Sequence, residues 1–386
     1  MKLRRLAEDF VVDEQSSLKI GESGRFAVYR LSKTHHTTLD AVSQISREWQ
    51  LSRKRIQHAG LKDRHAVTTQ WITIENGPAE NLDLDKISLE FLGRSKEAIA
   101  AKHIEANRFG IVLRSMSQAE CEAATQNLPR VAEFGFLNYF DDQRFGSISE
   151  NREFIAAAWI KQDYERALWL AFAEHLEHDS SFEREQKALL REHWGNWSEA
   201  KSALSKSHRR SIVTFLDDRP GDFSGAWARV DANLRGLWLS AFQSWLWNEI
   251  VSDLISQLHR DDPMAQLELK HGPVAFPCDL SQHGNFLAST KLPLPSSRLK
   301  PAPGFQSDVI THTLKRLGWN LDEIKVRKPR DRFFSKGERS VLVVPKGLKW
   351  IFEEDELDSA QQKLSLQFLL PSGSYATMLI KACLNA

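Results

Sequence analysis

One carboxylate of this chain, Asp63, lies directly between two cations, Lys62 and Arg64. Nearby positive charge favours the ionised form of a carboxyl group, so Asp63 should remain an anion. Because cations can also hold phosphates, the triplet suggests nucleophilic or base chemistry by Asp63 on a nucleic acid. The alternative for a Lys-Asp-Arg triplet taken alone is a cluster of ion pairs on the surface.

The residues on either side of Asp63 predict how the chain positions it. Gly60 lies just upstream, in a segment typical of a loop. The alternating apolar run Trp71–Ile74 lies just downstream and is typical of a strand. We therefore expect Asp63 on a loop that leads into a strand.

This segment resembles the Gly-x-Lys-Asp-(Arg/Lys)-x-Ala-Val-Thr-x-Gln signature of the TruD family of tRNA pseudouridine synthases. At the matching positions this sequence has Gly60, Lys62, Asp63, Arg64, Ala66, Val67, Thr68 and Gln70. Three other blocks resemble the same family and follow in its order: Ala7–Glu14, Asn138–Gly146 and Leu370–Thr377. The stretch Arg235–Asn248 is similar to a helix of the family's insertion domain. Matches that run in order from near the start of the chain to near its end make a chance origin remote.

Two positions depart from the family pattern. Asp141 stands where the family has a glycine after Asn-Tyr-Phe, which leaves open a different turn or a more acidic local field. The basic residue before the Asp-Phe block is a lysine in relatives of this family. Here the candidates are Arg4 and Arg5, which keep the charge but not the geometry.

The resemblance implies an isomerase that converts a uridine of tRNA, at position 13 in the D-arm, to pseudouridine. The reaction breaks the C1′–N1 bond, turns the base and joins C5 to C1′ without redox change, so we expect no cofactor and no metal. It needs an ionised carboxylate near C1′ or C2′, as a nucleophile or as a base on the sugar. Asp63 is the expected catalytic residue, and the sequence leaves both routes open.

A target base must leave its stack to be reached, and a flipped uracil needs an aromatic face and an amide for its polar edge. The resemblance implies that Phe10, Asn138 and Tyr375 contact the substrate, and Phe140 is a further candidate for an aromatic wall. The alternative for each aromatic residue is core packing. For Asn138 the alternative is a turn or a helix cap.

Positive charge is concentrated locally, since the net charge of the 386 residues is only +1. From Ile324 to Trp350, nine Lys and Arg residues face two acids. Such segments suit phosphate binding, although solvated surface is the alternative. The candidate RNA-binding cations are Lys62, Arg64, Arg144, Lys325, Arg327, Lys328 and Arg330.

Composition is ordinary for a soluble globular protein, with 41% hydrophobic and 27% charged residues. The three scattered cysteines argue against structural zinc and disulfides, and they fit a reducing cytoplasm. No apolar run reaches membrane-spanning length. We expect a cytoplasmic enzyme that acts on tRNA as a monomer, without membrane or metal.

The residue patterns predict an α+β chain in three parts. Residues 1–150 alternate strand-like and helix-like stretches, residues 151–338 are mainly helical, and residues 339–386 return to strands. By resemblance, the first and last parts form a pseudouridine-synthase-like catalytic domain with a mixed or antiparallel sheet. The middle part is then a mainly helical α+β insertion domain, and its Trp238, Trp245 and Trp247 are expected in the core.

Two other functional classes were weighed against the isomerase. A catalytically inactive RNA-binding or tRNA-folding module would keep the fold without using the carboxylate, and the complete Asp63 signature favours an enzyme instead. A glycosidic hydrolase is weaker, because a second well-placed carboxylate is not evident.

Overall fold

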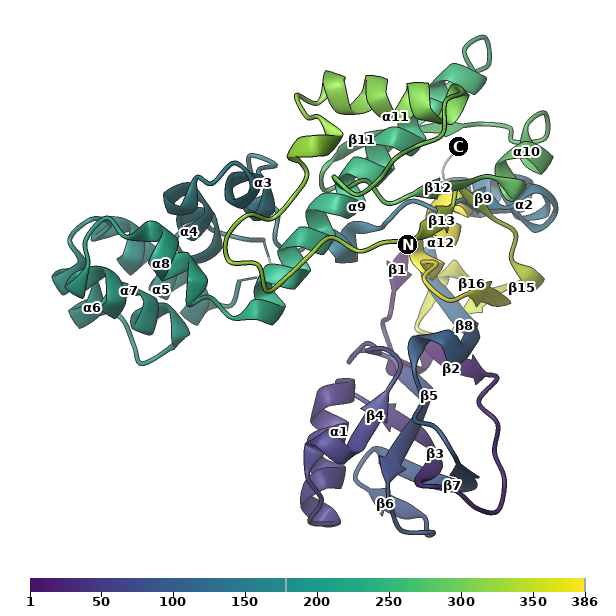
Figure 1. Cartoon of the computed structure of the whole chain (residues 1–386). Helices are drawn as coiled ribbons and strands as arrows, with labels where there is room; N and C mark the ends of the chain where they lie inside the picture. The colour runs from purple at the N-terminus through teal and green to yellow at the C-terminus, as the bar shows by residue number, and fades with distance from the viewer. Residues whose placement is uncertain (178, 385–386) are drawn as a thin grey trace. The chain divides into compact units, whose positions relative to one another are not determined.

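The computed structural model describes residues 1–177 and 179–384 and divides the chain into two compact units. The first unit contains Met1–Phe136 and Val343–Ala386, and the second contains Leu137–Leu342. Both ends of the chain therefore build the first unit (Figure 1).

The first unit is built around one mixed sheet. Its strands are β1 (Lys2–Leu3), β2 (Phe10–Ser16), β3 (Phe26–Thr34), β4 (Ile56–His58), β5 (Val67–Glu75), β6 (Leu82–Leu84), β7 (Ile87–Ser95), β8 (Ile104–Met116), β15 (Lys346–Asp355) and β16 (Asp358–Pro371). Their order is β15-β16-β8-β2-β5-β3-β7-β6, with β1 paired to β8 and β4 to β5. Only β2 and β5 pair in parallel among these described strands. The predicted α+β fold, with a sheet built from both chain ends, is confirmed.

Cross-strand register brings residues that are far apart in the sequence into the same row. Val12 lies opposite Phe109 on β8, and Phe109 lies opposite Phe368 on β16. The Phe109 and Phe368 rings stack at 5.3 Å between centroids. Such cross-strand aromatic pairs stabilise the pairing of the two chain ends. In the next such row along β2, Glu14 lies opposite Asn107.

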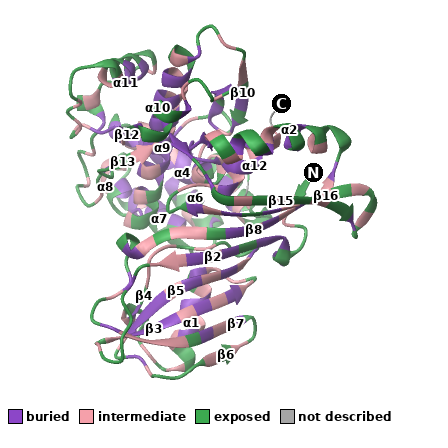
Figure 2. Ribbon diagram, turned by 90° about the vertical axis from the view of Figure 1, so that its right-hand side faces the viewer, coloured by how far each residue is buried: buried purple, intermediate pink, exposed green. Residues whose placement is uncertain are grey.

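Helix α1 (Thr38–Glu48) packs on the sheet of the first unit. Ala41, Val42 and Ile45 are spaced so that they share one face of the helix, and all three are buried. Figure 2 shows the alternation of buried and intermediate residues along β3 and β5, which supply the partners of this face. The helix begins with a capping box in which Thr37 and Asp40 each accept a backbone N–H from the other, both at 3.1 Å.

Helices α2 (Gln118–Phe134) and α12 (Ala376–Leu384) complete the first unit. The Asn127 side chain on α2 donates to the carbonyl of Cys383 on α12 at 3.3 Å. The ammonium group of Met1 binds the Glu120 carboxylate at 2.8 Å. Both ends of the chain are therefore tied to the same helix.

A buried ion network also joins the chain ends. The Arg114 guanidinium on β8 contacts Asp9, just before β2, at 2.8 Å and Asp355, at the end of β15, at 2.8 Å. All three side chains are at most 6% exposed. Asp355 also accepts the backbone N–H groups of Ser115 and Leu357 at 2.8 and 3.0 Å. Such complete pairing is what keeps buried charges tolerable.

The second unit is mainly helical. Its helices are α3 (Ile155–Ile160), α4 (Tyr164–Phe172), α5 (Ser181–Glu192), α6 (Trp197–Ala203), α7 (His208–Asp218), α8 (Phe223–Ala228), α9 (Ala232–Leu258), α10 (Gly284–Ser289) and α11 (Phe305–Arg316). Strands β10 (Met264–Leu269) and β11 (Gly272–Pro277) pair, as do β12 (Lys291–Pro293) and β13 (Glu338–Ser340). Strands β9 (Phe136–Leu137) and β14 (Leu342–Val343) contain the points where the chain passes between the units.

Two of the three α9 tryptophans that the sequence placed in the core are buried there. Trp238 and Trp247 are buried, at 8% and 0% exposure. Trp245 is half-buried and stacks on Phe154 at 4.9 Å between centroids. Within the described residues, no helix is long and apolar enough to cross a membrane.

The boundaries of the two units differ from the predicted boundaries of the three parts. Residues 137–150, expected with the first part, belong to the second unit. The reason is local packing, since Phe145 lies 6.4 Å from Phe154 and 4.7 Å from His271 between ring centroids. Residues 339–342, expected with the last part, also belong to the second unit, because β13 pairs with β12.

Removing the buried cation should destabilise the protein strongly. Arg114→Met leaves the carboxylates of Asp9 and Asp355 buried without their partner, and such losses cost about 3–5 kcal/mol. Urea unfolding followed by circular dichroism measures this change. Lys102→Met is the matched control, since it breaks an exposed pair with Glu97 and should change stability little. Equal losses of unfolding free energy in both variants would show that the buried ion pairs of Arg114 contribute no more to stability than an exposed pair does.

Candidate active site

Asp63 lies on the loop 59–66, which joins β4 to β5, as the sequence predicted. Its side chain is 45% exposed, whereas the polar side chains that hold the loop are largely buried. Those side chains come from β2, β3, α1 and β5, all within the first unit.

Lys33 on β3 holds the backbone of this loop. Its ammonium donates to the carbonyl oxygen of Asp63 at 2.9 Å and to that of Lys62 at 3.3 Å. It also donates to the carbonyl oxygen of His36 at 2.7 Å. Lys33 is 1% exposed, and an ammonium group has three N–H donors, so these contacts can satisfy it.

A chain of hydrogen bonds fixes the upstream half of the loop. The Lys62 backbone N–H donates to the Thr38 hydroxyl at 2.9 Å, and that hydroxyl donates to the Gln70 side-chain oxygen at 2.8 Å. The Gln70 amide nitrogen then donates to the Gly60 carbonyl at 3.2 Å. Thr38 and Gln70 are fully buried, so their orientations are tightly set.

The Lys62 side chain points inward, not toward solvent as expected for an RNA contact. Its ammonium lies 2.5 Å from the Glu14 carboxylate and 2.9 Å from the Asn107 side-chain oxygen. Glu14 is 1% exposed and also accepts the backbone N–H of Trp71 at 3.1 Å. A buried carboxylate requires such a cation, which is why Lys62 is committed to the protein interior.

Arg4 is the cation that meets the Asp63 carboxylate. Its guanidinium donates to Asp63 Oδ2 at 2.8 Å and lies 4.1 Å from the centroid of the Phe10 ring. Of the two candidates, Arg4 and not Arg5 is therefore the basic residue that contacts Asp63. Arg4 has a φ of 62°, an uncommon conformation for a residue with a side chain. Phe10 is buried, and its ring lies 6.2 Å from that of Phe109 in an edge-on arrangement.

Arg64 follows Asp63 in the sequence, and its side chain points to the surface. Its guanidinium lies 2.9 Å from the Asp40 carboxylate, and both side chains are well exposed. Hydrogen bonds from Arg64, and then from Thr37, lower the pKa of Asp40 to about 2. Arg64 remains accessible to a phosphate, unlike Lys62.

Tyr375 lies half-buried on the link between β16 and α12. Its carbonyl accepts the N–H of Met378 at 3.1 Å, at the start of α12. Pro371, at the end of β16, lies opposite Ala106, and Ala106 lies opposite Gln15 on β2. Tyr375 therefore follows shortly after Pro371 in the sequence. The sheet row that contains Pro371 lies next to the row that contains Glu14, whose carboxylate binds Lys62.

Asn138 and Phe140 belong to the second unit, unlike Asp63. The Asn138 side chain donates to the Ser340 carbonyl at 3.0 Å and accepts from Arg339 at 2.7 Å. The Arg339 guanidinium also lies 4.1 Å from the Phe140 ring centroid. Asn138 and Phe140 are both buried, at 4% and 7% exposure. Arg339 therefore fixes both residues through one cation.

The backbone conformation at Asp141, where the family has a glycine, does not require one. Asp141 has a φ of −89° and ψ of 169°, which any residue adopts. It is buried, and its carbonyl accepts the N–H of Arg144 at 2.8 Å. The Arg144 guanidinium donates to the Ser240 hydroxyl on α9 at 3.1 Å and lies 5.4 Å from the Phe140 ring centroid.

Sequence reasoning missed the residues that hold the Asp63 loop and the Asn138 amide: Lys33, Thr38 and Arg339. A signal existed for Lys33, because Leu31 and Lys33 share one face of a strand whose buried positions alternate. A lysine at such an inward position indicates a specific buried partner. Among the residues that the structure describes, no three His, Cys, Asp or Glu side chains group so as to hold a metal ion.

The protonation of Lys33 should make stability depend on pH. Burial lowers the pKa of Lys33 to about 8 from 10.5, while Asp63 acts in the opposite direction and Lys62 reinforces the lowering. Between these two pH values the unfolded chain binds more protons at this site, so raising the pH favours the folded state. Relative to Lys33→Met, the wild type should gain stability as the pH rises through this window.

Urea unfolding of both proteins at several pH values measures this trend. Lys96→Met, which removes an exposed lysine of the same unit, should run parallel to the wild type at every pH. A constant difference between the wild type and Lys33→Met across the window would contradict the prediction.

The chain has relatives among known proteins. A family model described as tRNA pseudouridine synthase D (TruD) matches residues 1–383. "Probable tRNA pseudouridine synthase D 2" of Methanocaldococcus jannaschii is 32% identical over 388 residues, which cover 99% of this chain and 91% of that protein. "tRNA pseudouridine synthase D" of Leptospira interrogans is 31% identical over 395 residues, covering 98% and 95%.

A solved structure is also similar to this chain. It is the crystal structure of a putative tRNA pseudouridine synthase D (TruD) from Methanosarcina mazei, with a TM-score of 0.74 and 26% sequence identity. The match covers 100% of this chain and 93% of that one. The four sequence blocks, the family model and these relatives agree along the whole length, and the chain belongs to the tRNA pseudouridine synthase D (TruD) family.

Proposed function

We propose that this protein converts a uridine of tRNA to pseudouridine and that Asp63 is its catalytic residue. One observation carries the proposal: the backbone at Asp63 is fixed by the buried Lys33, while the Asp63 carboxylate stays 45% exposed. A carboxylate that is both immobile and accessible is what attack on a bound nucleotide requires. The names of the relatives support the same activity.

The reaction is an isomerisation in which the atoms of the nucleotide are conserved. The C1′–N1 bond breaks and the C1′–C5 bond forms, while C5 loses a proton and N1 gains one. Asp63 can attack C1′ to form a sugar ester, or it can take a proton from C2′. Either route uses the Asp63 carboxylate, which accepts a hydrogen bond from the Arg4 guanidinium at 2.8 Å. Arg4 is proposed to orient this carboxylate.

Four residues are proposed to contact the flipped uracil, on the basis of family membership: Phe10, Asn138, Phe140 and Tyr375. Tyr375 is half-buried, so its ring can still receive a base. The Phe10 ring packs against the Arg4 guanidinium, at 4.1 Å from the ring centroid. In the second unit, Asn138 uses one N–H and one oxygen lone pair within the protein. An amide has one further N–H and lone pair, which suits the edge of a uracil. Phe140 is proposed to back Asn138.

Six cations are proposed to bind the phosphates of the RNA. Arg64 of the first unit is exposed, Arg144 of the second unit is half-buried, and Lys325, Arg327, Lys328 and Arg330 lie on an exposed segment of the second unit. Lys62 is better explained as a positioning residue, because its ammonium is occupied by Glu14. Such phosphate contacts fix register and orientation and carry little sequence information.

Asp63→Asn should abolish product formation while leaving tRNA binding. The amide keeps the size of the carboxylate but lacks its charge, so neither attack on C1′ nor removal of the C2′ proton is available. Pseudouridine in a tRNA transcript and the Kd for that transcript are the two measurements. Asp85→Asn, an exposed acid of the same unit, should keep full activity. Substantial pseudouridine formation by Asp63→Asn would refute the assignment.

Uridine 13 in the D-arm is the proposed target, on the basis of family membership. Mapping pseudouridine in cellular tRNA with and without this protein tests the position, and loss of the modification at position 13 is expected. An unchanged position 13, with loss elsewhere, would replace the proposed target by another. No change anywhere, together with intact tRNA binding, would favour an inactive RNA-binding module.

A further inference from the structure

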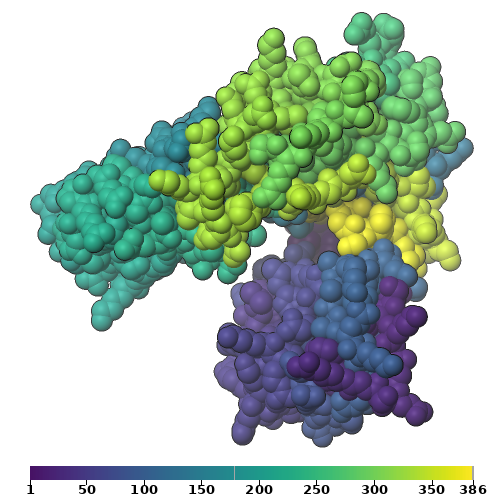
Figure 3. Space-filling model, viewed as in Figure 1, coloured from purple at the N-terminus to yellow at the C-terminus, as the bar shows by residue number. Residues whose placement is uncertain are grey.

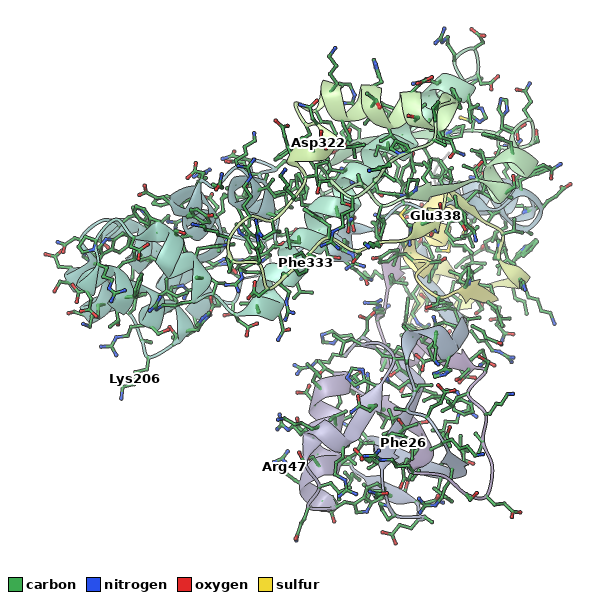
Figure 4. All side chains as sticks on the ribbon, viewed as in Figure 1. Phe26, Arg47, Lys206, Asp322, Phe333 and Glu338 are labelled. Atoms are coloured by element: carbon green, nitrogen blue, oxygen red, sulfur yellow. The ribbon has the colours of Figure 1, made fainter. Side chains whose placement is uncertain are left out.

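The second unit contains an open pocket of about 540 Å³ to which no role has yet been given. Four cations and one exposed aromatic ring line it: Arg298, Lys325, Arg327, Arg330 and Phe333. Figure 3 shows part of this stretch, near residue 330 on the colour bar, at the surface, and Figure 4 labels Phe333 there. Cations around an exposed ring are typical of sites for single-stranded nucleic acid.

Helix α9 holds the two loops that form the pocket. The buried Gln243 amide donates to the carbonyls of Pro295 and Ser335 at 3.1 and 3.0 Å, and its oxygen accepts the Ser335 N–H at 3.2 Å. The Ser297 N–H donates to the carbonyl of Ile324 at 3.0 Å, which ties the loops to each other. The pocket is therefore built before any ligand arrives, which lowers the entropic cost of binding.

The cations of the pocket have no ion-paired acid among the residues that the structure describes. Within residues 1–177 and 179–384, no carboxylate is ion-paired with Arg298, Lys325, Arg327 or Arg330. The one acid in this part of the chain between Lys325 and Arg332, Asp331, is paired with Arg235 on α9. The charge of the pocket thus remains available to an anion.

Phe333 gives the pocket an apolar face in addition to its positive charge. Its side chain is 55% exposed, while its neighbour Phe334 is buried at 7%. The Arg298 guanidinium lies 4.9 Å from the Phe333 ring centroid. An aromatic ring beside a planar cation is a platform on which a nucleobase can stack. A phosphate ion alone would leave the ring without a role.

We propose that this pocket binds one unpaired nucleotide of the tRNA, other than the uridine that is isomerised. The base stacks on Phe333 and Arg298, and the phosphates on either side contact Lys325, Arg327 and Arg330. The inference deepens the proposed function, because the ligand belongs to the same RNA. It adds a second point of recognition, which acts on binding and takes no part in the chemistry.

The stacking contact can be tested by changing the ring and the base together. Two probes are used, a single-stranded RNA of about ten nucleotides and the same backbone without bases. Phe333→Leu should weaken binding of the first probe by roughly five- to tenfold and leave binding of the second unchanged. Phe305→Leu is the matched control, since Phe305 is 44% exposed in the same unit and lies outside the pocket. It should bind both probes as the wild type does.

The phosphate contacts are separated from stacking by salt dependence. Lys325→Gln combined with Arg327→Gln should weaken binding of both probes and reduce the slope of log Kd against log salt by about 1.4, at about 0.7 per lost single-strand contact. Phe333→Leu should leave that slope unchanged. Lys206→Gln, an exposed lysine of the same unit shown in Figure 4, should change neither affinity nor slope.

With tRNA as substrate, the pocket variants should raise KM and leave kcat near its wild-type value. The inference is overturned if Phe333→Leu binds the probe with bases as tightly as the wild type, or if it loses equal affinity for both probes. Preference of the wild-type pocket for an acidic peptide over both RNA probes would also overturn it. These failures are distinct from that of the proposed function, which would appear as wild-type protein that forms no pseudouridine in tRNA.

Discussion

The conformation of the Asp63 loop depends on one buried ammonium group. Lys33 is 1% exposed and donates to the backbone carbonyls of Lys62 and Asp63, so a full charge lies beneath the residue that is proposed to do the chemistry. A buried lysine is costly unless its N–H groups are bonded and negative charge lies near. The carbonyls satisfy it, and Asp63 and Asp40 act to keep it charged. The loop and the lysine thus stabilise each other, because neither is satisfied alone.

The signature around Asp63 is better understood as a positioning device than as a row of RNA contacts. Lys62 binds the buried Glu14, and Gln70 binds the Gly60 carbonyl and the Thr38 hydroxyl. Only the side chains of Asp63 and Arg64 in this group are directed to the exposed surface. Carboxylates on loops are usually mobile, so a site on a loop requires supporting contacts of this kind. Lys62, the first charged residue of the signature, therefore helps to position the backbone of its neighbour Asp63.

Sequence patterns predicted regular elements well and polar partners poorly. The sheet built from both ends of the chain and the mainly helical middle part were predicted correctly. Asp63 was identified because its neighbours in the sequence carry a signature. The inward direction of Lys62 was not foreseen, because it depends on Glu14, a buried carboxylate on another strand. Such pairs are set by tertiary packing, which local sequence does not encode.

The geometry at Asp63 also depends on residues near the far end of the chain. Arg4 adopts an uncommon backbone conformation, and such a conformation persists only where its surroundings fix it. Its surroundings are fixed through Asp9, which accepts the N–H of Leu6 at 2.8 Å and is held by Arg114. Arg114 is held in turn by Asp355, which follows the second unit in the sequence. Arg4, which binds the Asp63 carboxylate, is thus linked through the nearby Leu6 backbone and Asp9 to the buried pair of Arg114 and Asp355. Residues from both ends of the chain therefore support the contact between Arg4 and Asp63.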